Sequence, residues 1–271
     1  MIRDHNLKIL VQAGIEESEA RKELLILHKE FPSSPQKIEE IIGERIKTRK
    51  PLQYLLGKAF FMDFEVEINE NVLIPRPETE ILVEETVRRS VACNTSTILD
   101  IGTGSGIIAI ALAKLIPNAK ITAIDIKKEI LDLAYKNAKK NNVEEKIQFK
   151  QCDIFSKCFE GLIEKNTFDL IISNPPYVKP EELKNLKPEV HLHEPRIALS
   201  GSRENKSGLI YYERMMYLCK DLINQTPTII GFEIDPPLVN GLKDLLKKYN
   251  FNNYEIVKDY SKLDRCLFVY P

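Results

Sequence analysis

The hydrophobic pattern divides the chain into a helical N-terminal part and a longer part in which strands and helices alternate. In the first part, apolar residues such as Ala20, Leu24 and Leu27 recur at the period of an amphipathic helix. Ser34-Pro35 supplies an N-cap and a first-turn proline for a further helix. We therefore predict a small helical domain over residues 1–57.

The period changes to that of a strand between residues 58 and 76. Four apolar residues there nearly alternate with polar ones: Phe61, Phe64, Val66 and Ile68. Asn69-Glu70-Asn71 is typical of a turn, and a second apolar run follows it at 72–74. We predict a β-hairpin linker over 58–76, with its turn at 69–71.

From residue 77 to the C-terminus, short apolar runs alternate with helical patterns. The predicted strands are 98–101, 121–125, 146–151, 168–173, 228–232, 254–257 and 266–270. The predicted helices begin at Pro77, which suits a first helical turn, and continue at 107–116, 128–140, 209–223 and 238–249. This alternation specifies an α/β domain over 77–271 with a Rossmann-like, doubly wound and mostly parallel sheet.

Composition narrows the class of protein without identifying a function. The chain is 43% hydrophobic and 29% charged, which is ordinary for a globular protein, and its net charge is -1. We see no apolar run long enough to span a membrane and no signal peptide. The scattered cysteines form no CxxC pair, so we expect small buried residues in a reducing compartment: Cys93, Cys152, Cys158, Cys219 and Cys266. These features favour a soluble cytoplasmic protein.

A glycine-rich segment follows the first predicted strand of the α/β domain: Asp100-Ile101-Gly102-Thr103-Gly104-Ser105-Gly106. Glycines let the backbone turn tightly and approach a ligand, and the following helix presents free N–H groups. The spacing is G-x-G-x-G, whereas a dinucleotide site has G-x-G-x-x-G. The carboxylate of Asp100 would repel a pyrophosphate, but it suits a cofactor that carries an ammonium and a sulfonium group.

Two further aspartates end the next two predicted strands. Asp125 is placed to accept hydrogen bonds from both hydroxyls of a ribose. Asp153 could accept from an adenine amino group, with Ile154 or Phe155 against the ring. Each aspartate alone could be a solvated strand end or a helix cap. Because the aspartates fall at successive strand ends, we predict a bound S-adenosylmethionine.

The fourth predicted strand of this domain stops at Asn174-Pro175-Pro176-Tyr177, because neither proline can donate a ladder hydrogen bond. The tetrapeptide lies where open α/β sheets bind ligands, beyond the carboxyl ends of the strands. It offers an amide, rigid carbonyls and an aromatic ring, but no acid, base or thiol. It can hold a planar group that carries NH2, while the chemistry must come from a cofactor. The alternative is that Asn174 only caps a turn.

These motifs together resemble class I methyltransferases that act on exocyclic or amide NH2 groups. Asn-Pro-Pro-Tyr also occurs in adenine-N6 DNA methyltransferases and in several RNA and protein enzymes, so it indicates the acceptor chemistry and not the substrate. Segments 53–57, 72–80 and 194–199 are more specific. They resemble the HemK/PrmC family of protein-glutamine N5-methyltransferases.

The resemblance implies a function in translation termination. The substrate would be the glutamine in the Gly-Gly-Gln loop of class I peptide chain release factors, recognised by residues 1–57 and methylated by residues 77–271. The Asn174 oxygen and the Pro175 carbonyl would accept the two N–H bonds of that amide, next to Pro176, and Tyr177 would pack on its flat face. Asn174 would also border the cofactor.

Other implications and alternatives follow from the same motifs. We expect a monomer with no stable nucleic acid, membrane or metal partner, although His191 and His193 lie close together in the sequence. A ribosomal-protein glutamine methyltransferase remains the main alternative, and an adenine-N6 nucleic-acid methyltransferase is a weaker one. The chain departs from the family at 201–208, which is longer and more polar than the usual short link.

Overall fold

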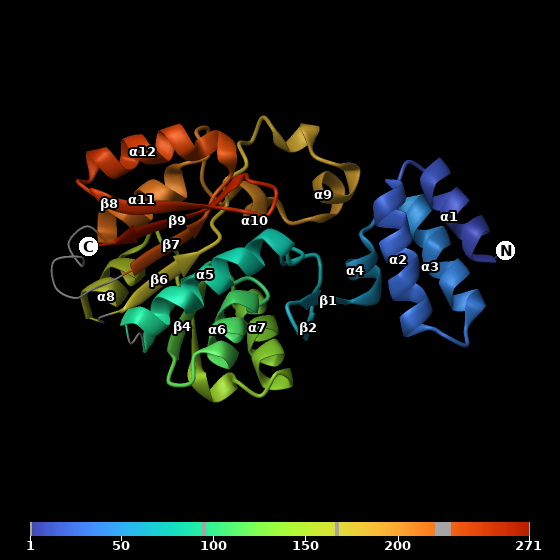
Figure 1. Ribbon diagram of the computed structural model, residues 1–271, viewed down its shortest axis with the longest axis horizontal. Coiled ribbons are helices and arrows are strands. Elements are labelled where there is room, and N and C mark those ends of the chain that lie inside the picture. Colours follow the sequence, from blue (N-terminus) through green and yellow to red (C-terminus); the bar gives the residue numbers. More distant parts are fainter. Residues whose placement is uncertain (1, 94–95, 166–167, 220–228, 271) are drawn as a thin grey trace.

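The N-terminal part of the computed structural model is a helical domain with its own core. The structure describes residues 2–93, 96–165, 168–219 and 229–270. The helices of this domain are α1 (Ile2–Gln12), α2 (Glu17–Glu30), α3 (Pro35–Thr48) and α4 (Leu52–Leu56). They enclose a separate cluster of buried apolar residues, which includes Leu10, Leu27 and Ile42. The predicted helical pattern is therefore confirmed, and Figure 1 shows this domain at one end of the molecule.

The hairpin is present, but the prediction placed its turn wrongly. Strands β1 (Lys58–Phe61) and β2 (Phe64–Glu67) pair in antiparallel fashion, and Phe61 lies opposite Phe64. The turn is therefore Met62-Asp63, where Met62 has a positive φ of 50°. Residues 69–71 only redirect the chain. The run 72–74 is not a strand, and the Tyr54 hydroxyl donates to the Val72 carbonyl at 2.7 Å.

The α/β domain contains the predicted doubly wound sheet, in the order β5-β4-β3-β6-β7-β9-β8. Strands β5 to β7 in this order are parallel, β9 is antiparallel to β7, and β8 is antiparallel to β9. The strands are β3 (Thr97–Ile101), β4 (Lys120–Asp125), β5 (Ile147–Gln151), β6 (Leu170–Ser173), β7 (Ile229–Glu233), β8 (Asn253–Lys258) and β9 (Asp264–Tyr270). The fourth predicted strand starts two residues late, since the Asp169 carboxylate accepts from the N–H groups of Ser96 and Thr97 at 2.8 Å each.

Helices cover both faces of the sheet (Figure 1). One face packs against α5 (Pro77–Cys93), α6 (Ile107–Leu115) and α7 (Lys128–Lys140). The other packs against α8 (Lys157–Lys165), α11 (Ile210–Cys219) and α12 (Val239–Lys248). The short helices are α9 (Pro188–His193), α10 (Arg196–Ser200), η1 (Glu144–Lys146), η2 (Leu183–Asn185) and η3 (Pro236–Leu238). The predicted end of the helix at 209–223 and the residue 228 lie outside the described residues.

The order of the strands fixes where a ligand can bind. The chain runs outward from β3 through β4 to β5, and then returns to place β6 on the other side of β3. Ile101 at the end of β3 pairs with Ser173 at the end of β6. This reversal is the switch point at which open α/β sheets bind ligands. It brings the glycine-rich segment next to Asn174.

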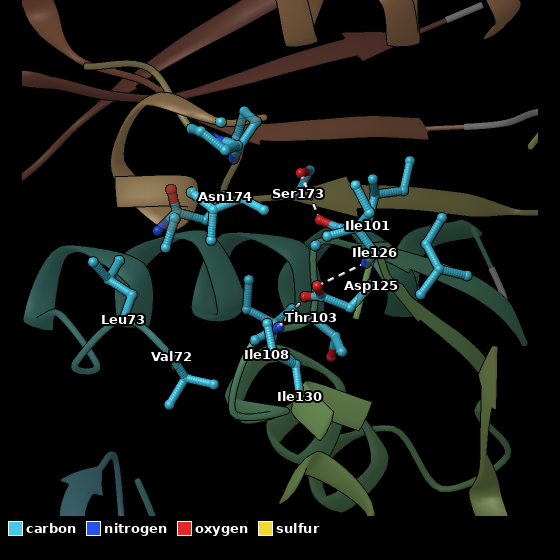
Figure 2. Close-up of a pocket in the computed structure, with 18 of the residues that line it drawn as sticks. Val72, Leu73, Ile101, Thr103, Ile108, Asp125, Ile126, Ile130, Ser173 and Asn174 are labelled. Atoms are coloured by element: carbon cyan, nitrogen blue, oxygen red, sulfur yellow. Dashed lines mark hydrogen bonds between the residues drawn. The ribbon is translucent and has the colours of Figure 1, made fainter. Parts of the chain in front are cut away.

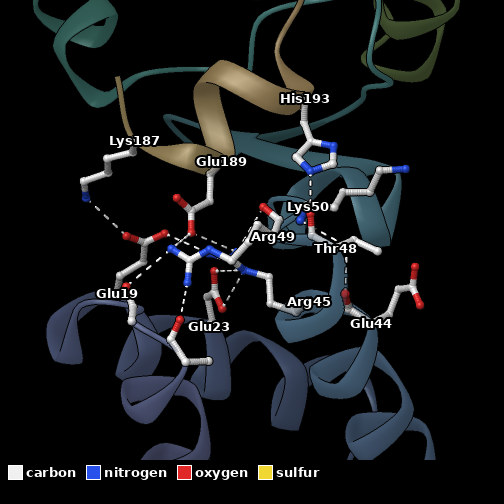
Figure 3. Close-up of polar contacts among 12 residues, drawn as sticks. Glu19, Glu23, Glu44, Arg45, Thr48, Arg49, Lys50, Lys187, Glu189 and His193 are labelled. Atoms are coloured by element: carbon white, nitrogen blue, oxygen red, sulfur yellow. Dashed lines mark hydrogen bonds and ion pairs between the residues drawn. The ribbon is translucent and has the colours of Figure 1, made fainter. Parts of the chain in front are cut away.

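A buried ionic cluster joins the N-terminal domain to α9 (Figure 3). The Arg45 side chain is only 1% exposed and donates to Glu23 of α2 at 3.0 Å and to Glu189 of α9 at 3.1 Å. Arg49 also pairs with Glu189, at 2.5 Å. The ring of His193 contacts the Thr48 carbonyl at 2.8 Å. The segment that follows the tetrapeptide is therefore held by the N-terminal domain.

Two smaller expectations concern cysteines and membranes. Cys152, Cys219 and Cys266 are buried free thiols, whereas Cys158 is exposed, so the expectation of burial is wrong for Cys158. The side chain of Cys93 lies outside the described residues. Among the helices that the structure describes, none has the length and apolarity needed to cross a membrane.

Candidate active site

A cavity lies at the carboxyl edge of the sheet, at the switch point between β3 and β6 (Figure 2). Its empty volume is about 1080 Å³, including the open solvent at its mouth. Most of the predicted site residues line it: Gly102, Thr103, Gly104, Ser105, Asp125, Asp153, Ile154, Asn174, Pro175 and Pro176. Asp100, Gly106 and Tyr177 do not. The fold thus brings the predicted cofactor and acceptor segments to one space.

The glycine-rich segment forms an open cradle. Gly102 and Gly104 have positive φ values of 72° and 55°, and a Cβ on either would meet no atom closer than 4.0 Å. Because these two residues have no side chain, the space beside the backbone stays open and forms part of the cavity. Gly106 serves another purpose, since a Cβ on it would come within 3.2 Å of Ala134 Cβ. It allows α6 and α7 to pack closely.

Asp100 lies below this cradle and is fully buried. The Thr103 hydroxyl donates to Asp100 Oδ2 at 2.6 Å, while Oδ1 has no hydrogen-bond partner among the described residues. Burial, together with the nearby charge of Asp125, raises the pKa of Asp100 to about 7. The open cradle suits the predicted cofactor, whereas Asp100 is covered by the cradle and does not line the cavity. A direct contact between Asp100 and the cofactor stays a prediction.

We expect Asp100→Asn to flatten the dependence of stability on pH. The folded protein holds a proton on Asp100 up to a pKa of about 7, whereas the ordinary value is 3.8. Between these values the folded state binds more protons than the unfolded state, so stability falls as pH rises, by up to about 4 kcal/mol. Urea unfolding from pH 4 to pH 8 should show this fall in the wild type and a smaller one in the variant. Parallel curves would contradict the burial of this charge.

Asp125 ends β4 and faces the cavity with both oxygens partly engaged. Its Oδ2 accepts the Gly104 N–H at 3.0 Å, and its Oδ1 accepts the Ile126 N–H at 2.8 Å. Burial raises the pKa of Asp125, and these backbone donors lower it. A carboxylate has about four acceptor positions, so each oxygen can accept one more hydrogen bond. This geometry suits the two hydroxyls of a ribose.

The polar segment 201–208 borders the cavity through Gly201 and Ser202, and Asp153 also lines the cavity. Asp153 Oδ1 accepts the Phe155 N–H at 2.9 Å, and Arg203 approaches Oδ2 at 3.6 Å. Gly201 is required there, because a Cβ would lie 1.8 Å from the hydroxyl of Tyr211. Asn205 in the same segment donates to the Pro176 carbonyl at 3.1 Å. The segment in which this chain departs from the family therefore packs against the site.

Asn174 is oriented by hydrogen bonds from outside its own segment. Its Nδ2 donates to the hydroxyl of Thr79 at 3.2 Å, and Thr79 donates to the Glu233 carboxylate at 2.6 Å. Within the described chain, no donor reaches Asn174 Oδ1. Tyr177 packs against the core on the α11 side, with no surface in the cavity. Burial raises its pKa well above the ordinary value.

Sequence reasoning missed the residues that hold these segments in place. Asn137 of α7 is fully buried and donates to the carbonyls of Ser105 at 2.9 Å and Glu67 at 2.8 Å. It ties the cradle to the hairpin. Its partners are 32 and 70 residues away, so no local pattern could have revealed it. Thr79 had a signal, since it lies in the segment 72–80, but helix capping explained that segment equally well.

The segments that carried the family resemblance surround the cavity. Arg76 lines it and donates to both oxygens of Glu194, at 2.6 and 2.7 Å. Ile197 and Ala198 also line it. His193 contacts the Thr48 carbonyl of the N-terminal domain. Among the residues that the structure describes, no group of histidine, cysteine or acidic side chains could hold a metal ion.

Comparison with known proteins agrees with this architecture. A family model described as a methyltransferase domain matches residues 94–197. The N-terminal domain of human METTL16 in complex with SAH superimposes with a TM-score of 0.54, at 16% identity, over 86% of this chain and 82% of that one. A human methyltransferase 10 domain containing protein gives a TM-score of 0.54 at 16% identity, over 75% and 87%. The fold and cavity therefore define a methyltransferase of the S-adenosylmethionine-dependent fold class.

Curated relatives identify the family. The release factor glutamine methyltransferase of Chlorobaculum tepidum is 38% identical over 83% of this chain and 75% of its own length. The enzyme of the same name from Flavobacterium psychrophilum is 40% identical over 85% and 79%. That of Fusobacterium nucleatum is 37% identical over 85% and 63%. The chain belongs to the release factor glutamine methyltransferase family, as the sequence motifs predicted.

Proposed function

We propose that this protein transfers a methyl group from S-adenosylmethionine to the side-chain nitrogen of the glutamine in the Gly-Gly-Gln loop of peptide chain release factors. One observation carries the proposal beyond the family name. A single cavity connects the cradle of Gly102 and Gly104 with Asn174 and Pro175. A cofactor in the cradle and an amide at the tetrapeptide would therefore meet inside it. Release factors act in translation termination, so our proposal includes a cytoplasmic location for the protein.

The acceptor side of the cavity must make an amide nitrogen reactive. The bound cofactor supplies an electrophilic methyl group on its sulfonium. Asn174 Oδ1 and the Pro175 carbonyl accept hydrogen bonds from the two N–H groups of the glutamine amide. These hydrogen bonds orient the nitrogen toward that methyl group. As the nitrogen bonds to the methyl carbon, the carbon–sulfur bond would break and leave S-adenosylhomocysteine. Positive charge would then develop on the nitrogen, where these two oxygens would stabilise it. The nitrogen then loses one proton to water, so the site needs no general base.

The direct test is methylation of a purified release factor. Incubation with the protein and S-adenosylmethionine should add the mass of one methyl group to the peptide that contains Gly-Gly-Gln, and fragmentation should place it on the glutamine. A release factor with alanine at this position should not react. Ribosomal proteins and adenine-containing DNA or RNA, tested in parallel, represent the alternatives. Methylation of one of these and not of the release factor would overturn the proposal.

The relatives favour the release factor over these alternatives. All the curated relatives reported above are named for release factor glutamine, not for a ribosomal protein. The likeness to METTL16 lies at 16% identity and shows the fold alone. The surface of the N-terminal helices is mixed in charge, with Glu16, Glu39 and Glu44 among its lysines, whereas nucleic-acid binding favours a continuous basic face.

We also propose that residues 1–57 and the hairpin bind the release factor. A second, apolar cavity lies between them and is lined by Ile26, Leu52, Gln53, Leu56, Lys58, Ala59, Phe60, Ile74 and Pro75. Ile74 and Pro75 also line the active-site cavity, so the two cavities share a wall. A factor that inserts its glutamine into the active-site cavity would then come close to the second cavity. Phe60 is 52% exposed there.

Phe60→Glu should raise KM for the intact release factor about tenfold or more, the effect of losing an apolar interface contact. Its kcat and its affinity for S-adenosylmethionine should not change. Leu115→Glu is the matched control, since Leu115 is 45% exposed at the end of α6, away from the carboxyl edge of the sheet. Equal KM values for both variants and the wild type would exclude this surface.

A further inference from the structure

Three residues from separate elements form a directed chain of hydrogen bonds that ends in the active-site cavity. Glu233 is the last residue of β7, Thr79 lies in the first turn of α5, and Asn174 follows β6. The Thr79 hydroxyl donates to Glu233 Oε2 at 2.6 Å, and Asn174 Nδ2 donates to the same hydroxyl at 3.2 Å. Thr79 is 1% exposed and Glu233 is 2% exposed. Water therefore cannot replace either partner without rearrangement.

The direction of this chain decides which atom of Asn174 faces the substrate. The oxygen and nitrogen of a side-chain amide are similar in size, so only hydrogen bonds select between its two orientations. An ionised carboxylate accepts but cannot donate, and the Thr79 hydrogen must therefore point to Glu233. The hydroxyl then has only lone pairs to offer, and Asn174 must present its NH2 to them. Asn174 Oδ1 is left on the opposite corner of the amide.

We propose that Glu233 and Thr79 are positioning residues, which hold Asn174 with its oxygen toward the substrate amide. This inference rests on the proposed function. If Glu233 were neutral, it could donate to Thr79, and Thr79 could then donate to Asn174 Oδ1. The amide would turn over and present NH2 to the NH2 of the glutamine, where two donors cannot pair. The orientation of Asn174, and hence turnover, depends on an acceptor at Glu233.

The surroundings of Glu233 show that its ionisation is balanced near neutrality. Burial raises the pKa of Glu233 to about 7. The Thr79 hydroxyl lowers this pKa, Glu78 of α5 raises it, and Arg265 of β9 and Arg76 lower it. The other titratable side chains that sense its charge are Tyr177, Tyr212 and Cys266. The proton on Glu233 is therefore gained or lost within the pH range of an ordinary assay.

The test substitutes Thr79, the middle residue of this chain of hydrogen bonds, with residues of similar shape. Thr79→Val removes the hydroxyl and should lower kcat about 100-fold, the effect of a misplaced catalytic group. KM for the release factor and affinity for S-adenosylmethionine should change much less. Thr79→Ser restores the hydroxyl and should restore most of the turnover. Thr86→Val is the matched control on the same helix, because Thr86 is fully buried and its hydroxyl has no partner among the described residues.

A pH profile separates this role from a structural one. With both substrates saturating, kcat of the wild type should fall as pH decreases below about 7, where Glu233 becomes protonated. Glu233→Gln has no proton to gain or lose at this position in this pH range, so its kcat should lack this limb. This profile decides the matter if Thr79→Val fails to bind the cofactor. A wild type that does not methylate the factor overturns the proposed function and this inference. A wild type that does, beside Thr79→Val with equal kcat or Glu233→Gln with an unchanged profile, overturns the inference alone.

Discussion

Asn174→Ala should reduce turnover of the release factor about 100- to 1000-fold, by analogy with the loss of one oxyanion-hole donor. The variant removes the oxygen that accepts an N–H bond of the glutamine, and this bond strengthens as charge develops on the nitrogen. The strand, the prolines and the cradle remain in place, so affinity for S-adenosylmethionine should change much less. Measurement of kcat at saturating substrates, with cofactor affinity by calorimetry, tests both statements.

Two companion variants sharpen the test of Asn174. Asn174→Asp keeps an oxygen but loses the NH2 that donates a hydrogen bond to the Thr79 hydroxyl. It also places a second negative charge near Glu233. It should be as impaired as the alanine variant. Asn240→Ala, at an exposed position of α12, should behave like the wild type. Wild-type turnover by Asn174→Ala would mean that the amide is held elsewhere.

Asp125→Ala should weaken the binding of S-adenosylmethionine about 100-fold or more. Two ribose hydroxyls would each lose a charged acceptor, at roughly 1.5–3 kcal/mol per hydrogen bond. The variant also releases the N–H of Gly104, which Asp125 accepts at 3.0 Å, so part of the loss would come from a looser cradle. Titration calorimetry on the folded variant measures the total, and Asp132→Ala, at an exposed position of α7, is the control.

A cofactor analogue separates these two contributions at Asp125. An analogue that lacks a ribose hydroxyl should bind the wild type more weakly, while its affinity for Asp125→Ala should match that of S-adenosylmethionine. If the missing hydroxyl weakens binding to both proteins equally, Asp125 does not contact the ribose. Unchanged affinity of the folded variant for S-adenosylmethionine would lead to the same conclusion.

The sequence was sufficient where one short segment determines its own structure. Buried β-branched runs gave the strands of the sheet, and the glycines at 102 and 104 occupy the positive-φ positions that the cradle requires. Asn174 and Pro175 follow from the abrupt end of β6. These features depend on residues that are close in the chain, and the cavity brings them together as expected.

The sequence was insufficient where a residue acts through a distant partner. The alternating pattern was correct for the hairpin, but it could not show that Met62 would adopt a positive φ and form the turn. Asp100 was expected to meet the cofactor directly, yet Thr103 bonds to one of its oxygens and the cavity does not reach it. Glu233 belongs to no recognisable motif, and its partner Thr79 lies 154 residues away, so no local pattern could indicate their contact.

The ionic cluster around Arg45 limits how the two domains can be exchanged or separated. A chimera whose N-terminal helices lack basic residues at positions 45 and 49 would leave Glu189 without its partners, and Glu189 is 7% exposed on the catalytic half. A buried charge without its partner costs about 3–5 kcal/mol, so such a hybrid would lose much of its stability. Residues 45 and 189 should therefore be inherited as a pair. The hybrid should have its junctions drawn so that α9 travels with the helices it contacts.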